Sequence, residues 1–119
     1  MDILQYRDFC MQLKGVEETM PFDDKILVFK VLGKMFSLTN IDTYESINLK
    51  CDPEIAIELR EKYTEVTPGY HMNKKHWNTI NVKGSINDSL IKEWTLDSYN
   101  LVVSKMTKKM QKELAELSN

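Results

Sequence analysis

Residues 66–82 read VTPGYHMNKKHWNTINV, and this stretch joins a turn, a basic and aromatic loop, and a strand. Thr67-Pro68-Gly69-Tyr70 predicts a type II turn, because proline presets φ at the second position and glycine accepts a positive φ at the third. The run from His76 to Val82 contains aromatic and β-branched residues, which favours a strand that closes at Gly84. The stretch therefore predicts a shaped loop that leads into one strand of a sheet.

Three further strands are expected upstream of this stretch. Residues 25–31 (KILVFKV) hold β-branched and aromatic side chains in a run too short for a buried helix. Leu32-Gly33-Lys34 can reverse the chain into residues 35–39 (MFSLT), since the glycine supplies the positive φ of a tight hairpin. Residues 46–50 (SINLK) alternate polar and apolar side chains, as in a sheet with one wet face. We expect these strands to pair antiparallel.

Two helices are expected on either side of these strands. Asp2 followed by Gln5 has the spacing of a capping box, and Gly15 is expected to stop that first helix. Asp52-Pro53 places a capping carboxylate before a proline at the first helical position. This pair predicts a second helix that ends near Thr64.

A helical region follows the last strand, capped by Asn87 or Ser85 and broken near Thr107. The predicted order is α-β-β-β-α-β-α. It indicates an α+β fold of two layers, with helices packed on one face of an antiparallel sheet. A length of 119 residues, with 42% hydrophobic and 29% charged residues, fits one domain spanning residues 1–119.

The N-terminal residues mix charged and apolar side chains and lack the basic and apolar segments of a secretory signal. We therefore expect a cytoplasmic protein without a membrane attachment, with Cys10 and Cys51 as reduced thiols. Residues 1–65 carry a charge of −5 and residues 66–119 a charge of +3. The C-terminal half is thus the candidate surface for a polyanion.

The loop within residues 66–82 is the best candidate for a functional site. Lysines there can contact phosphates, imidazole and amide groups can form hydrogen bonds, and an aromatic ring can stack on a base. The candidate nucleic-acid-binding residues, from this loop and from the C-terminal region, are His71, Asn73, Lys74, Lys75, His76, Lys105, Lys108 and Lys109.

Other interpretations of the loop remain open. In a structural interpretation, Pro68 and Gly69 shape the loop, Tyr70 and Trp77 pack beneath the sheet, and the lysines are solvated. A metal site would need more ligands than the two histidines supply, so we expect no metal and no other cofactor. The chain contains no motif of a serine hydrolase, a nucleotide-binding loop or a zinc protease, and we expect no enzymatic activity.

Several stretches together resemble the YjbR/MmcQ family over almost the whole chain. They are Pro21-Phe22, residues 28–31 and 33–36, Asn48-Leu49-Lys50-Cys51-Asp52-Pro53, residues 67–79, Ser98-Tyr99 and residues 101–105. The resemblance implies a two-layer α+β fold similar to type III secretion chaperones and to frataxin-like CyaY. It also implies DNA binding, which is assigned to the family from a proposed double-wing arrangement. Asp23 and Thr107 depart from the family pattern, where glycine and proline are frequent.

The leading hypothesis is a small, non-enzymatic DNA-binding protein, with a monomer favoured. The alternative is a protein-interaction module with chaperone-like architecture, which predicts an exposed apolar patch on a helix or on the free sheet face. A third hypothesis, small-molecule binding, requires a pocket lined by Tyr70 and Trp77. A surface shared by Lys74, Lys75 and the C-terminal lysines would favour DNA.

Overall fold

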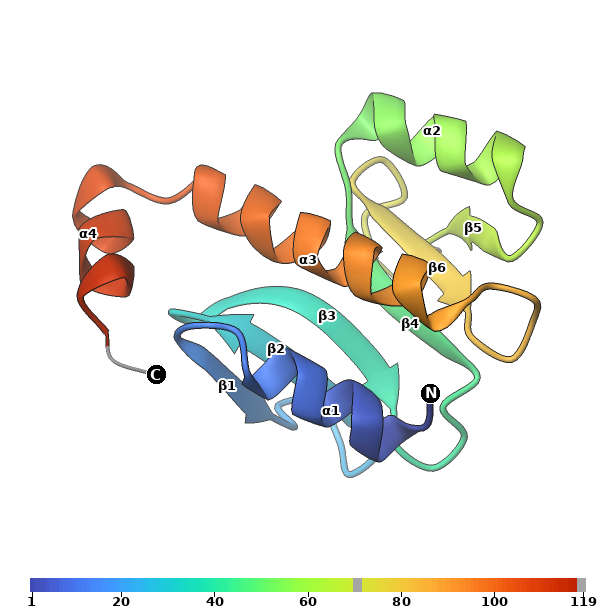
Figure 1. Ribbon diagram of the computed structural model, residues 1–119, viewed down its shortest axis with the longest axis horizontal. Helices are drawn as coiled ribbons and strands as arrows, with labels where there is room; N and C mark the ends of the chain where they lie inside the picture. The colour runs from blue at the N-terminus through green and yellow to red at the C-terminus, as the bar shows by residue number, and fades with distance from the viewer. Residues whose placement is uncertain (70–71, 118–119) are drawn as a thin grey trace.

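The computed structural model describes residues 1–69 and 72–117, which form a curved antiparallel sheet with helices against it (Figure 1). The helices are α1 (Ile3–Met11), α2 (Pro53–Lys62), α3 (Asp88–Ser104) and α4 (Lys108–Glu116). The strands are β1 (Val16–Thr19), β2 (Ile26–Val31), β3 (Lys34–Asn40), β4 (Ser46–Lys50), β5 (Val66–Pro68) and β6 (Trp77–Asn81). Within the described ranges no helix combines the length and the apolar character needed to cross a bilayer.

The six strands lie in the order β1-β2-β3-β4-β6-β5, and every neighbouring pair is antiparallel. The predicted α+β class and the order of its elements are confirmed, and the four predicted strands form within one residue of their expected ends. β1 and β5 are additional short strands at the two edges. Pro68 is tolerated in β5 because an edge strand has one side free of ladder hydrogen bonds.

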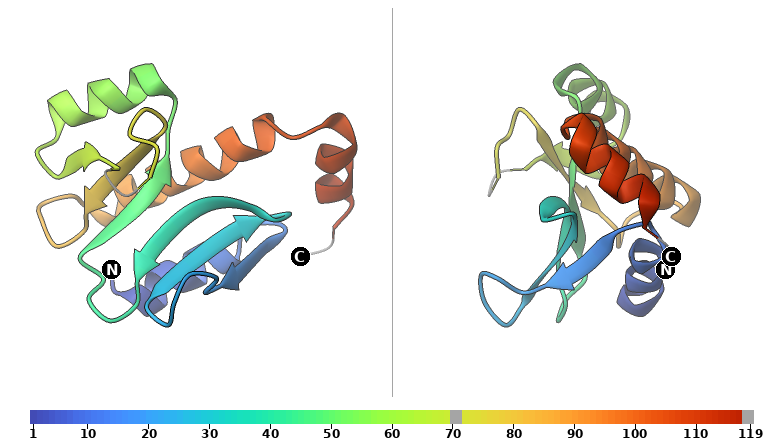
Figure 2. Two further views of the ribbon diagram at one scale, coloured as in Figure 1. Left: turned by 180° about the vertical axis from the view of Figure 1, so that it is seen from behind. Right: turned by 90° about the vertical axis from the view of Figure 1, so that its left-hand side faces the viewer.

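The helices cover one face of the sheet, as predicted (Figure 2). β2 turns Leu27, Phe29 and Val31 toward this layer, and the buried Tyr6 of α1 packs edge-on against Phe29. The Tyr6 hydroxyl lies 2.7 Å from Ser37 Oγ of β3 and 3.0 Å from Thr95 Oγ1 of α3. One buried side chain thereby links two helices to the sheet, which fixes their relative positions.

The opposite face of the sheet carries a smaller cluster of buried side chains. Val28, Leu38 and Trp77 form it, with Met35 and Met72 packed at its margin. Trp77 is only 7% exposed. The prediction that Trp77 packs beneath the sheet is confirmed, whereas Tyr70 lies outside the described residues.

The β2–β3 hairpin closes through a two-residue turn at Leu32 and Gly33, because Val31 pairs with Lys34. Gly33 has a φ of 81°, as expected, and Leu32 also adopts a positive φ of 46°. Positive φ at both positions is the geometry of the type I′ turn that suits twisted strands. The turn sets Lys34 at the tip of the hairpin.

The predicted N-caps are present, whereas α1 ends at Met11, before the stop expected at Gly15. Asp2 and Gln5 form the capping box of α1, Asp52 accepts a hydrogen bond from Glu54 N, and Asn87, one of the two proposed caps, starts α3. The break near Thr107 is also confirmed, since Thr107 caps α4. The second helix ends at Lys62, two residues before the predicted end.

The prediction that Gly69 adopts the positive φ of a type II turn at residues 67–70 is wrong. Gly69 is not among the residues of positive φ; it pairs with β6 instead, donating its N–H to Trp77 O at 2.9 Å. A Cβ on Gly69 would lie 2.8 Å from Trp77 Cβ and 3.0 Å from Trp77 O. Glycine is needed here for close approach between two strands, not for an unusual turn.

Candidate functional site

Three lysines from three separate elements surround one concavity of about 450 Å³. Lys34 comes from the hairpin tip, Lys50 from the end of β4, and Lys105 from the C-cap of α3. The same concavity is lined by Trp77 and by the apolar side chains of Met35, Val102 and Met106. We call it the lysine hollow.

Among the described residues that line it, the lysine hollow has three basic side chains and no acidic one. Among the described residues, the ion pairs involve the N-terminal amine and Arg7, and none involves Lys34, Lys50 or Lys105. The ammonium groups therefore keep their donors for solvent or a ligand. Like charges gathered around a concave surface with apolar walls focus the field there, and this arrangement suits an anion.

A second concavity of about 270 Å³ adjoins the lysine hollow and is called the loop pocket. Asn73 and His76 line it from the loop before β6, Trp77 from the start of β6, and Lys50 and Lys105 from the ends of β4 and α3. The structure thus brings together three of the predicted residues, Asn73, His76 and Lys105. The small-molecule hypothesis required a pocket lined by Tyr70 and Trp77; Trp77 lines both concavities, and Tyr70 lies outside the described residues.

Lys74 and Lys75 are exposed on the same loop, next to Asn73. A hydrogen bond inside the loop stabilises its conformation: the Lys75 N–H donates to Asn73 Oδ1 at 2.9 Å. It is also held from outside by Arg60 of α2. Arg60 Nη2 donates to the Lys74 carbonyl and, at 3.4 Å, to the Trp77 carbonyl, while Arg60 Nε donates to Asn78 Oδ1 at 2.7 Å.

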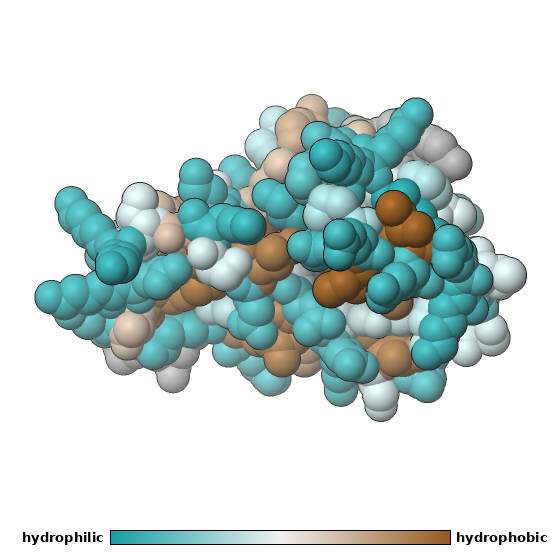
Figure 3. Space-filling view, turned by 90° about the horizontal axis from the view of Figure 1, so that it is seen from above, coloured by the Kyte–Doolittle hydropathy of each residue, from teal (hydrophilic) through white to brown (hydrophobic). Residues whose placement is uncertain are grey.

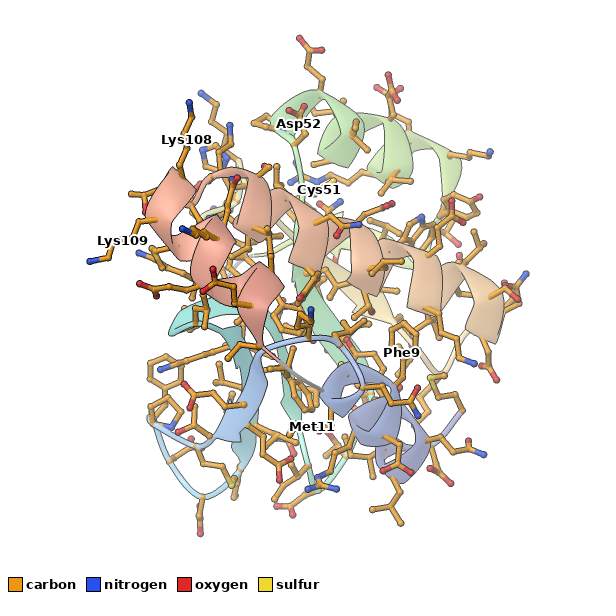
Figure 4. All side chains as sticks on the ribbon, turned by 60° about the vertical axis from the view of Figure 1, so that its left-hand side comes forward. Phe9, Met11, Cys51, Asp52, Lys108 and Lys109 are labelled. Atoms are coloured by element: carbon orange, nitrogen blue, oxygen red, sulfur yellow. The ribbon has the colours of Figure 1, made fainter. Side chains whose placement is uncertain are left out.

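The remaining predicted lysines do not join this site. Lys108 and Lys109 stand on the first turn of α4, are exposed, and project away from the body of the protein (Figure 4). Neither lines the lysine hollow or the loop pocket. Asn73 and His76 of the loop share the loop pocket with Lys105, whereas Lys74 and Lys75 are not among the residues that line it. His71, also predicted, lies outside the described residues.

A third concavity, of about 430 Å³, lies between α2 and α3 and is called the α2–α3 groove. Its walls are Ile55 and Leu59 of α2 and Trp94 and Leu101 of α3, and its floor is formed by side chains of β4 and β6. Figure 3, seen from above, shows apolar side chains exposed among hydrophilic ones along this face.

Cys51 and Asp52 lie where the α2–α3 groove meets the loop pocket, at the start of α2 (Figure 4). Burial raises the pKa of the Cys51 thiol to about 11, and the nearby carboxylates of Asp52 and Asp97 add to the shift. The pKa of Asp97 is itself raised, by burial and by Glu93. Cys51 is therefore a neutral, weakly nucleophilic thiol at ordinary pH. Across the described ranges, no three His, Cys, Asp or Glu side chains are grouped to hold a metal ion.

Sequence reasoning missed Lys34, Lys50 and Arg60. Lys34 begins β3, Lys50 ends β4, and both lie in the acidic half of the chain, so no local cluster of charge marks them. Arg60 falls in the last turn of α2, where a basic residue is expected for the helix dipole alone. Only the pairing of β4 with β6, which sets Lys50 beside Trp77, could have pointed to the site.

Comparisons with known proteins agree on one family. A family model described as YjbR matches residues 11–101. The chain is 38% identical over 105 residues to the uncharacterized protein YbdF of Escherichia coli O157:H7, covering 87% of this chain and 86% of YbdF. It is 31% identical over 118 residues to the uncharacterized protein YjbR of Escherichia coli strain K12, covering 98% and 100%.

Solved structures share the fold. The crystal structure of Deinococcus radiodurans protein DR2400, a DUF419 domain, matches with a TM-score of 0.89 at 42% identity, covering 96% of this chain and 88% of that one. A Pseudomonas syringae protein matches with a TM-score of 0.71 at 27% identity, covering 85% and 98%. None of these descriptions states an activity, so function rests on the geometry of the site.

Proposed function

We propose that this chain, which belongs to the YjbR family, binds DNA by holding backbone phosphates in the lysine hollow and along the adjoining loop. The observation that carries the proposal is the convergence of Lys34, Lys50 and Lys105 beside Trp77, without an ion pair among the described residues. Lysine–phosphate contacts supply the sequence-independent part of DNA affinity.

The loop before β6 extends this surface. Lys74 and Lys75 are exposed on it, and Asn73 and His76 line the loop pocket together with Lys105. Phosphates of neighbouring nucleotides could be shared between the hollow and the loop, with polar groups of the loop orienting the strand. The proposed contacts are backbone contacts, so little sequence preference is expected.

The first test is the salt dependence of binding, measured by fluorescence anisotropy with a labelled DNA. If about four phosphates are neutralised, the logarithm of affinity falls with the logarithm of salt at a slope near −3.6, which is about a 150-fold loss between 50 and 200 mM salt. A flat salt profile, or no binding to duplex or single-stranded DNA at 50 mM salt, would refute the proposal.

The second test compares two exposed lysines of the α3 region. Lys105 lines the hollow, whereas Lys92 lies near Phe9 at the other end of α3. Lys105→Gln is expected to weaken binding and to reduce the salt slope by about 1. Lys92→Gln removes the same charge and should leave both unchanged. Equal losses in the two variants would show that net charge matters and the hollow does not.

A protein-interaction role is the second candidate, because apolar side chains are exposed on the helices. Ile55 and Ile57 of α2 are 50% and 52% exposed, and Leu96 of α3 is 40% exposed. The free sheet face offers less, since its apolar residues Val28, Leu38 and Trp77 are buried. Self-association through α2 predicts a dimer in light scattering that Ile57→Gln dissociates; a monomer at all concentrations would exclude that form of the role.

A further inference from the structure

We propose that the α2–α3 groove receives an unpaired base of single-stranded DNA while the phosphate of the same strand lies in the lysine hollow. This inference rests on the proposed function and makes it more specific. It assigns the groove a ligand class, an unstacked nucleobase, and it predicts that single-stranded DNA is preferred over duplex.

The three concavities adjoin one another. The α2–α3 groove and the loop pocket share Lys50, Cys51, Asp52 and Leu101, and the loop pocket and the lysine hollow share Lys50, Trp77 and Lys105. Lys50 lines all three concavities. A ligand with an anionic part and an apolar part can therefore occupy the hollow and the groove at once, with its anion near Lys50.

The groove has the chemistry that a base requires. Its lining includes the apolar side chains of Trp94, Leu59, Leu101 and Ile80, which suit the faces of a flat aromatic ring. Exposed polar groups, Asp97 among them, stand at its rim, where the edge of a base carries its hydrogen-bonding groups. The volume of about 430 Å³ lies within the range of small-ligand sites, roughly 300–1,000 Å³.

The buried polar side chain among the described residues that line the groove, Asn78, is already engaged, which leaves the more exposed polar residues to contact the ligand. Asn78 is buried; its Oδ1 accepts from Arg60 Nε at 2.7 Å, and its Nδ2 donates to the Ala56 carbonyl at 3.4 Å. The interior thus favours stacking and burial over recognition of a particular base. A base paired within a duplex cannot enter the groove without leaving the stack, at a cost in unpairing and unstacking.

The main test measures anisotropy with two short strands of equal phosphate number, oligo-dT and the same strand with abasic sites in place of its bases. Loss of base burial is expected to weaken binding of the abasic strand about tenfold. If both strands bind equally, the inference is wrong and the proposed function stands. If neither strand binds, and duplex does not bind either, the proposed function itself has failed.

A matched pair of variants places the base in the groove. Ile55 lines the groove and Ile57 does not, yet both are on α2 and about half exposed. Ile55→Gln should weaken oligo-dT binding about fivefold through lost apolar contact, without changing binding of the abasic strand. Ile57→Gln should change neither. Equal oligo-dT affinity for the two variants would mean that bases contact another surface, and it would overturn the inference.

Discussion

Arg60 is expected to hold the basic loop in the shape that DNA binding requires, and Arg60→Met tests this. The guanidinium of Arg60 connects α2 to the carbonyls of Lys74 and Trp77 and to the side chain of Asn78. Methionine keeps much of the apolar length of the arginine stem and removes every donor. The loop that carries Lys74 and Lys75 then loses its attachment to α2.

The expected loss of stability follows from the acceptors that the substitution leaves behind. Asn78 is 1% exposed, so its Oδ1 cannot regain a partner from solvent after Arg60 is removed. A buried acceptor without a donor costs about 1–3 kcal/mol, and hydrogen bonds from a charged donor contribute a similar amount. We expect a net loss of about 2 kcal/mol, which lowers Tm by about 8 °C for a chain of this length.

Thermal unfolding by circular dichroism and DNA binding by anisotropy give two independent measurements. Arg7→Met is the charge-matched control for DNA binding. Arg7 of α1 pairs with Glu18 of β1, and β1 forms the edge of the sheet opposite to β6 and β5. Arg60→Met should reduce DNA affinity about fivefold as the loop loosens, and Arg7→Met should not. If Arg60→Met keeps the unfolding temperature and the DNA affinity of the unsubstituted protein, the attachment described for Arg60 has no energetic role.

Three further predictions concern the core, the strand contact and the thiol. Tyr6→Phe should lower the free energy of unfolding by about 1–3 kcal/mol, because it removes a hydroxyl that is hydrogen-bonded to Ser37 and Thr95. Tyr44→Phe should be neutral or stabilising by up to about 1 kcal/mol, since the buried Tyr44 hydroxyl has no partner among the described residues. Chemical denaturation compares the two variants, and equal losses of stability would contradict the prediction. Gly69→Ala should cost about 1–3 kcal/mol, because its methyl group would meet Trp77; an unchanged Tm would show that the strands can separate there. Alkylation of Cys51 by iodoacetamide should be slow at neutral pH, because the raised pKa of the thiol keeps the thiolate scarce. The alkylation rate should rise about tenfold per pH unit toward pH 11, and a rate that levels off near pH 8.5 would contradict the raised pKa.

Elements that depend on short-range chemistry could be predicted from the sequence. Asp2, Asp52, Asn87 and Thr107 cap their helices through hydrogen bonds to residues two or three positions away. Gly33 sits in a turn whose geometry involves only its neighbours. Such features need no knowledge of the rest of the fold, because the competing conformations are also local.

The sequence-based predictions failed where contacts with a distant segment of the chain determine the local structure. β1 is a four-residue strand containing two glutamates, and it exists because β2 offers a free edge and because Arg7 of α1 binds Glu18. Gly69 was assigned a turn conformation, whereas its role is set by the approach of Trp77, eight residues later. No local pattern reports that approach.

The stretch from Val66 to Val82 and the strands before it indicated the fold class and the basic loop, and the capping residues indicated where the helices start. The site was decided by tertiary structure. Antiparallel pairing brings Lys50 beside Trp77, the hairpin turn presents Lys34, and the end of α3 delivers Lys105. Two of these three lysines belong to the half of the chain with net negative charge. The net charge of a sequence segment does not predict the charge of a site, because charges interact according to their distance in space.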